Sequence, residues 1–113
     1  MKRRTKEFGL RAMKLADALP KSAAGKAIGG QLVRASTSVA ANYRAACRAR
    51  SGADFRNKLA VCEEEADESA FWIELAADAQ LIPPRRLREL LNESNELTAI
   101  LVASRRTSAQ RHA

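Results

Sequence analysis

The most prominent candidate functional residues are five basic side chains in a stretch that contains no acid. Between Ser22 and Arg50 there is no Asp or Glu, and the cations are Lys26, Arg34, Arg44, Arg48 and Arg50. At about 100° per residue, the first four fall within one quarter of a helix surface. Clustered cations attract polyanions and bind phosphates by releasing counterions. The predicted chemistry is phosphate binding, with nucleic acid as the leading partner.

The charge of the chain is uneven as well as in excess. Residues 1–56 hold thirteen Lys or Arg against three acids, whereas residues 57–113 hold seven against ten. The net charge of +7 therefore understates the basic half. An arginine-rich face that is merely solvated is the alternative interpretation. It applies equally to the further cations, which are Lys2, Arg3, Arg4, Lys6, Arg85, Arg86 and Arg88. Few aromatic side chains are free to stack on bases, so we expect recognition of phosphates and shape.

Catalytic and metal chemistry have little support in the sequence. An acidic cluster occupies residues 63–68, but the only histidine is His112, far from it in the chain. Carboxylate metal sites in bundles need inward Glu residues with a Glu-x-x-His partner, so we predict no metal and no cofactor. No serine or cysteine has a base beside it, so we predict no enzyme. A magnesium-dependent nuclease using Glu65 or Glu68 is a distant alternative, and these two acids are expected to pair with arginines of a neighbouring helix or subunit.

Cys47 and Cys62 form no paired motif, and we interpret both as small core residues rather than a disulfide. The basic N-terminus is followed by no apolar run, and no stretch reaches the length of a membrane span. We therefore expect a cytoplasmic protein with no membrane contact.

The elements that position these residues are expected to be helices, because Ala, Leu, Arg and Glu dominate a chain of one-domain length. Capping residues and prolines divide the chain into four segments. The predicted helices are about Lys6–Leu19, Ser22–Arg50, a third after an N-cap at Ser51, and a fourth from Pro84 to near Arg105. Short connections predict an all-α, antiparallel up-down-up-down four-helix bundle over residues 1–105, with residues 106–113 as a basic, disordered tail.

The third helix carries more apolar surface than one core requires. Its regular seam comprises Phe55, Leu59, Cys62, Ala66, Ser69, Ile73 and Ala76. A second arc projects from the far side and is flanked by two acids, and such surplus apolar residues usually mark an interface. The predicted oligomer interface is Val61, Glu65, Glu68, Phe71, Trp72 and Leu75.

Three motifs give the chain a family resemblance. They are LVRASTSVAANYRAA from Leu32, Ser51-x-x-Asp54-Phe55-x-x-Lys58-Leu59, and Glu65-Ala66-x-Glu68-Ser69-x-x-Trp72-Ile73-Glu74. From Phe8 to about Thr107 the chain resembles the 23S rRNA intervening-sequence proteins, also called the four helix bundle protein family. The residues that match the pattern are Arg34, Asn42, Arg44, Lys58, Glu65, Glu68 and Trp72. Ala45 departs from it, because many relatives have an acid there.

The resemblance implies a bundle that assembles into a pentameric ring. The family includes proteins encoded in insertions within large-subunit ribosomal RNA genes. It is also similar to the accessory protein of diversity-generating retroelements, a basic pentamer that binds nucleic acid and a reverse transcriptase. We therefore expect a non-enzymatic homo-oligomer that binds RNA or DNA through phosphate contacts. The alternative is an interaction scaffold or accessory subunit that docks an acidic partner such as a reverse transcriptase.

Overall fold

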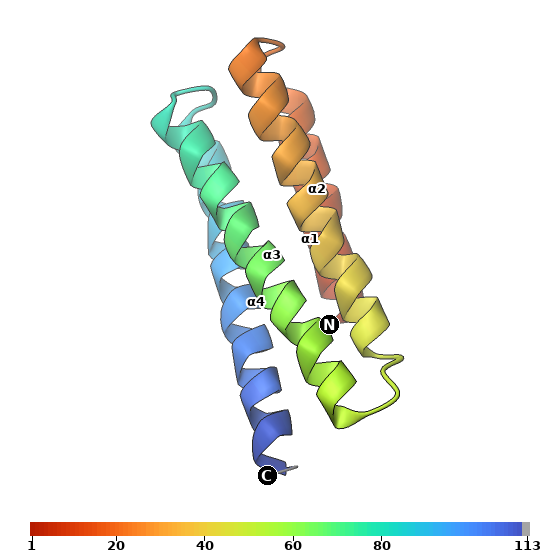
Figure 1. The fold of residues 1–113 in the computed structure, drawn as a ribbon. Helices are drawn as coiled ribbons and strands as arrows, with labels where there is room; N and C mark the ends of the chain where they lie inside the picture. The colour runs from red at the N-terminus through yellow and green to blue at the C-terminus, as the bar shows by residue number, and fades with distance from the viewer. Residues whose placement is uncertain (112–113) are drawn as a thin grey trace.

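The computed structural model describes residues 1–111, which form four helices joined by short connections (Figure 1). The helices are α1 (Lys2–Ala18), α2 (Ala23–Ala46), α3 (Gly52–Asp78) and α4 (Pro84–Arg111). Consecutive helices run in opposite directions, and the molecule is elongated, with extents of 48 × 20 × 19 Å. The predicted all-α up-down four-helix bundle is confirmed. None of the helices within residues 1–111 is both long and apolar enough to cross a membrane.

Three helix starts follow the predicted sequence signals. The hydroxyl of Ser22 accepts a hydrogen bond from the Gly25 amide, and that of Ser51 accepts one from the Asp54 amide, both at 3.1 Å. Each hydroxyl satisfies an N–H group that has no partner within its own helix. Pro84 occupies the first position of α4, where its missing N–H removes no helical hydrogen bond.

Both α1 and α4 extend beyond their predicted bounds. Helix α1 begins at Lys2 instead of near Lys6. We expected residues 106–113 to form a tail, but α4 continues through Arg111. Neither extension has an apolar stripe that periodicity would detect. Ion pairs to other helices stabilise the adjoining turns, through Arg4 in α1 and Arg105 in α4. The remainder of the expected tail, residues 112–113 with the sole histidine, lies outside the described residues.

Helix α2 ends earlier than predicted, at Ala46. The chain then turns tightly, because the Arg48 amide donates to the Ala45 carbonyl and the Ala49 amide to the Ala46 carbonyl, each at 3.0 Å. Arg48 and Arg50 therefore lie in the connection to α3 rather than on a continuous helical strip.

The core contains the seam that the sequence predicts for the third helix. Tyr43 and Phe55 are half-buried and pack against it. Ser94 was missed by the apolar pattern, yet it is fully buried, and its hydroxyl donates to the Ala66 carbonyl at 2.7 Å. The buried residues include Phe8, Ala12, Leu15, Leu19, Ile28, Leu32, Ala35, Val39, Ala46, Leu59, Cys62, Ala66, Ser69, Ile73, Ala76, Leu87, Leu90, Leu97 and Leu101.

The two cysteines differ in environment. Cys62 is buried, as predicted, and burial raises the pKa of its thiol to about 12. Cys47 is exposed, so the core interpretation is wrong for this residue. The reason is that α2 has already ended when the chain reaches it.

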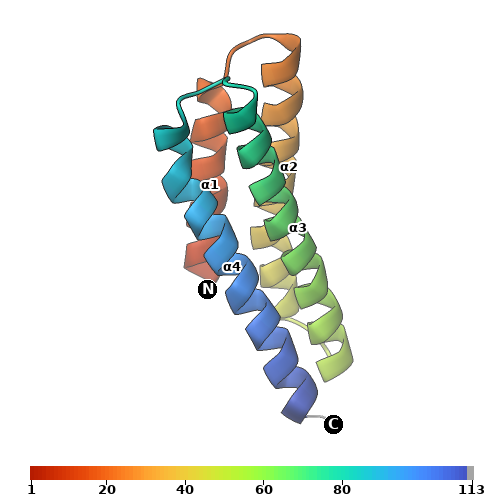
Figure 2. The same cartoon turned by 90° about the vertical axis from the view of Figure 1, so that its left-hand side faces the viewer.

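Helix α1 is much shorter than α4, with 17 residues against 28. Its Gly9 backs onto α2, where an added Cβ would lie 3.7 Å from the Ser36 carbonyl oxygen. Figure 2 shows α4 continuing well past the N-terminus. The start of α1 therefore lies beside the C-terminal half of α2, and beyond it the bundle consists of three helices.

Candidate nucleic-acid interface

The five cations of the predicted strip are all exposed, but they do not form one site. Lys26 is separated from Arg44 by eighteen residues of helix, or about 27 Å along the axis. It lines a different hollow with Lys21 and Asp17, near the turn between α1 and α2. The structure therefore separates Lys26 from the cations at the other end of α2.

Arg34 is engaged in an ion-pair network with α3. Its Nη1 donates to Glu65 Oε2 at 3.1 Å, and its Nη2 pairs with Glu68. Glu68 Oε2 also accepts a hydrogen bond from the Trp72 indole N–H at 3.1 Å, and Arg34 Nε donates to Gln31 at 2.9 Å. The expected pairing of Glu65 and Glu68 with a neighbouring helix is confirmed, and these two carboxylates offset the charge of Arg34.

A group of five cations lies between the start of α1 and the end of α2. A groove of about 660 Å³ is lined by Lys2, Arg3, Lys6, Arg44 and Arg48, with Ala40 and Ala41 as its small residues. We call this the cationic groove. No carboxylate of residues 1–111 forms an ion pair with any of its five cations. Two predicted strip residues thus join three of the N-terminal cations that the sequence grouped separately.

A second, smaller hollow adjoins the cationic groove. It measures about 380 Å³ and is lined by Ala41, Arg44, Ala45, Arg48, Arg50, Asp54 and Lys58. We call it the side hollow. Its one acid is occupied, because Lys58 Nζ donates to Asp54 Oδ1 at 2.6 Å. That hydrogen bond lowers the pKa of the Asp54 carboxyl. The side hollow therefore retains a positive character.

Arg4 faces away from the cationic groove and fastens the start of α1 to α4. Its Nε and Nη2 donate to the two carboxylate oxygens of Glu93 at 2.8 and 2.7 Å, and Nη2 also donates to Glu96 at 2.9 Å. These bonds lower the pKa of Glu93 and raise that of Arg4. We call this contact the Arg4 clamp. It fixes the helical turn that presents Lys2, Arg3 and Lys6.

The predicted oligomer interface on α3 is only partly exposed. Val61 and Phe71 are 39% and 52% exposed, respectively. Trp72 and Leu75 are half-buried against the core, and the Phe71 and Trp72 rings meet edge to face with centroids 4.9 Å apart. Two further exposed apolar residues, Leu10 and Met13, lie on α1 and were missed because they fall outside its apolar stripe.

The acidic cluster on α3 is used for packing between helices. Arg105 of α4 donates to both carboxylate oxygens of Glu63 at 2.5 and 3.1 Å, and this contact raises the pKa of Arg105. Among the described residues, no group of three or more His, Cys, Asp or Glu side chains is placed to hold a metal ion.

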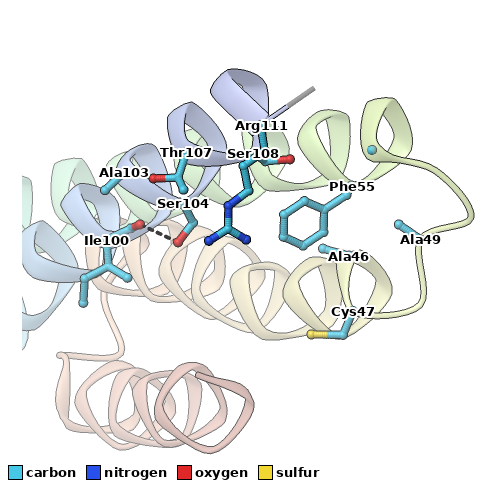
Figure 3. A pocket seen from close by; sticks show the side chains of 11 residues that line it. Ala46, Cys47, Ala49, Phe55, Ile100, Ala103, Ser104, Thr107, Ser108 and Arg111 are labelled. Carbon is cyan, nitrogen blue, oxygen red and sulfur yellow. Dashed lines mark hydrogen bonds between the residues drawn. The ribbon is translucent and has the colours of Figure 1, made fainter. Parts of the chain in front are cut away.

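A third hollow, of about 760 Å³, lies at the end of the bundle where α1 is missing (Figure 3). It is lined mainly by small and apolar residues, among them Phe55 and Ile100, and Arg111 is the only charged side chain among the described residues that line it. Figure 3 shows the Arg111 side chain reaching into this space, while Ser104 is bonded to the Ile100 carbonyl at 2.9 Å. Among the described residues that line it there is no acid.

The chain is similar to a known protein family and to a solved structure. Residues 1–103 match the family model described as 23S rRNA-intervening sequence protein. The chain is also similar to a crystal structure of a protein with unknown function from the S23 ribosomal protein family of Bacteroides thetaiotaomicron VPI-5482. The two share 32% identity over 90% of this chain and 94% of that chain, with a TM-score of 0.84. No curated protein matches.

Proposed function

The chain belongs to the 23S rRNA-intervening sequence protein family, and from that premise we propose that it is a non-enzymatic protein that binds nucleic acid through phosphate contacts. The binding surface is the cationic groove together with the side hollow. Because the family description names 23S rRNA, structured RNA is the first ligand to test.

The observation that carries this proposal is a concentration of six cations at one end of the bundle that form no ion pair with any carboxylate of residues 1–111. They are Lys2, Arg3, Lys6, Arg44, Arg48 and Arg50, from α1, α2 and the α2–α3 connection. An unpaired Lys or Arg can neutralise a phosphate and release the counterion that was condensed on the nucleic acid there. Each such contact therefore gains free energy from counterion release. Paired cations such as Arg34 gain much less, because a carboxylate already neutralises them.

The surface suits recognition of the backbone rather than the bases. Among residues 1–111, no aromatic side chain lines the cationic groove or the side hollow. Stacking platforms are what proteins use to read unpaired bases, whereas arginine and lysine contacts to phosphates carry no sequence information. We therefore expect affinity that depends strongly on salt and weakly on sequence.

The direct test is binding to labelled RNA and DNA duplexes by fluorescence anisotropy. The variant R44Q/R48Q removes the two arginines that line both hollows. The variant R85Q/R88Q is the matched control, because it removes the same charge from exposed positions at the start of α4. We expect the first to weaken binding at least about tenfold more than the second. Equal losses would refute the assignment of the site.

An acidic protein partner is the other outcome that this test distinguishes. If purified protein binds neither RNA nor DNA duplexes at low salt, the nucleic-acid proposal fails. Recovery of a stoichiometric partner that survives nuclease treatment would then favour the interaction scaffold.

We also propose that α3 mediates self-assembly, with the pentameric ring implied by the family resemblance as the expected form. Exposed Phe71 and Val61 supply the apolar contact, and a second copy of the chain is its occupant. Assembly would repeat the cationic groove around the ring and convert a weak site into a multivalent one. Light scattering on F71E should report a smaller particle than the wild type. L10E is the control, because Leu10 is also 52% exposed but lies on α1; unchanged mass for F71E would refute the proposal.

A further inference from the structure

We infer that the cationic groove and the side hollow are two phosphate subsites on either side of a shared arginine ridge, which seat successive phosphates of one nucleic-acid strand. This inference rests on the proposed function and specifies how the ligand is held. It differs from a diffuse electrostatic attachment, in which only the total charge of the surface matters.

The first support is that three residues line both hollows. Ala41, Arg44 and Arg48 belong to the walls of the cationic groove and of the side hollow alike. Arg44 lies in the last turn of α2, and Arg48 follows two residues after the end of that helix, in the connection to α3. The two hollows therefore adjoin each other across these shared residues, as neighbouring phosphate subsites on one strand must.

The second support is that each hollow has cations in addition to those of the ridge. Lys2, Arg3 and Lys6 of α1 line the cationic groove opposite α2. Arg50 and Lys58 line the side hollow, where Lys58 donates a hydrogen bond to Asp54. Each hollow thus offers a phosphate more than one cation, which an isolated surface cation does not provide.

The third support is the chemistry of the ridge. A guanidinium presents five N–H donors in a planar fork, so one arginine can donate to phosphates on both sides of it. A lysine ammonium carries the same charge but lacks the fork. The proposal therefore requires arginine, whereas a diffuse attachment requires only a positive charge at these positions.

The fourth support is the small residue that both hollows share, Ala41. Ala41 is exposed and contributes to both hollows, and its side chain ends at Cβ. A strand can therefore approach the α2 backbone closely between the cations. A larger apolar residue at this position would occupy both subsites without changing any charge.

Two charge-conserving variants test the inference, with a labelled RNA duplex of about 20 base pairs as the probe. R44K/R48K keeps the charge and removes the forks, and A41L enlarges the small residue that both hollows share. We expect each to weaken binding at least about tenfold, the equivalent of one lost charged hydrogen bond. The matched controls are R85K/R88K on α4 and A27L at the opposite end of α2, all at exposed positions, and these should bind like the wild type.

The outcomes separate this inference from the proposed function. If R44Q/R48Q weakens binding while R44K/R48K and A41L bind like the wild type, the charge is required but the seated phosphates are not, and the inference is overturned. If the wild type does not bind the RNA probe or its DNA equivalent, both fail. Helicity and melting temperature confirm folding, which leucine at a helical position should preserve.

Discussion

Replacing Arg34 by glutamine should destabilise the bundle and leave nucleic-acid binding unchanged. The sequence groups Arg34 with the phosphate-binding strip, whereas the structure commits it to Glu65 and Glu68. Glutamine keeps much of the side-chain length and removes the charge. It therefore leaves Glu65, whose side chain is only 15% exposed, without its cation.

The expected loss of stability is about 1 kcal/mol. A hydrogen bond to a charged partner contributes more than this when buried, but the Arg34 side chain is 49% exposed, so solvent screening reduces its value. For a chain of 113 residues this corresponds to a fall in melting temperature of about 4 °C.

Urea unfolding at fixed protein concentration, followed by circular dichroism and by Trp72 fluorescence, measures this loss. Trp72 is the only tryptophan, and its indole N–H donates to Glu68, so its emission reports on the same network. A double-mutant cycle that combines R34Q with E65Q isolates the interaction energy between Arg34 and Glu65. The reasoning is refuted if R34Q keeps wild-type stability, or if it weakens RNA binding as much as R44Q/R48Q does.

Three further predictions follow from the packing and titration of other residues. G25A should destabilise the protein by about 2 kcal/mol, because a Cβ there would lie 1.8 Å from a backbone oxygen; G30A, which meets nothing within 4 Å, should stabilise it by up to about 1 kcal/mol in the same urea assay. The Arg4 clamp lowers the pKa of Glu93 from its usual 4.5. The contribution of Glu93 to the free energy of unfolding is therefore present above that value and disappears as the pH falls through the lowered pKa. E93Q should make stability less dependent on pH below this value, and an unchanged acid profile would contradict the clamp. A thiol reagent should titrate Cys47 rapidly in the native protein and Cys62 only after unfolding, because burial raises the pKa of Cys62 to about 12; two rapidly reacting thiols would show that the core around α3 opens readily.

The fold could be predicted from the sequence because its main signals are local. The seam of α3 repeats at steps of three and four residues, and positions such as Leu59 and Ile73 are fully buried where the pattern places them. Caps at Ser22 and Ser51 involve residues only three positions apart. Such signals survive without knowledge of the tertiary structure.

The helix extensions could not be predicted in the same way. The start of α1 is held by Arg4 and Glu93, which are 89 positions apart in the sequence. The pairing of Arg34 with Glu65 likewise spans 31 positions. No periodicity within one helix reveals which cation a distant acid will neutralise. The sequence therefore identified the basic helix correctly but overstated the number of cations free for a ligand.

The composition of the cationic groove was partly within reach of the sequence. In an antiparallel hairpin, residues at similar distances from the turn meet, so the basic start of α1 must lie beside the C-terminal half of α2. Helical periodicity within α2 alone does not reveal that the cations of α1 and α2 line the same groove. Lys2, Arg3 and Lys6 belong with Arg44 and Arg48, while Lys26 does not.

The most direct test of the central claim is the salt dependence of binding to an RNA or DNA duplex. If all six unpaired cations contact phosphates, log Kd should change with log salt with a slope of about 5, a loss of affinity of about 10³ between about 50 and about 200 mM salt. R44Q/R48Q should lower the slope by about 2, whereas R34Q should leave it unchanged. If R34Q reduced the slope by as much per removed charge as R44Q/R48Q does, the assignment of the cationic groove would be contradicted.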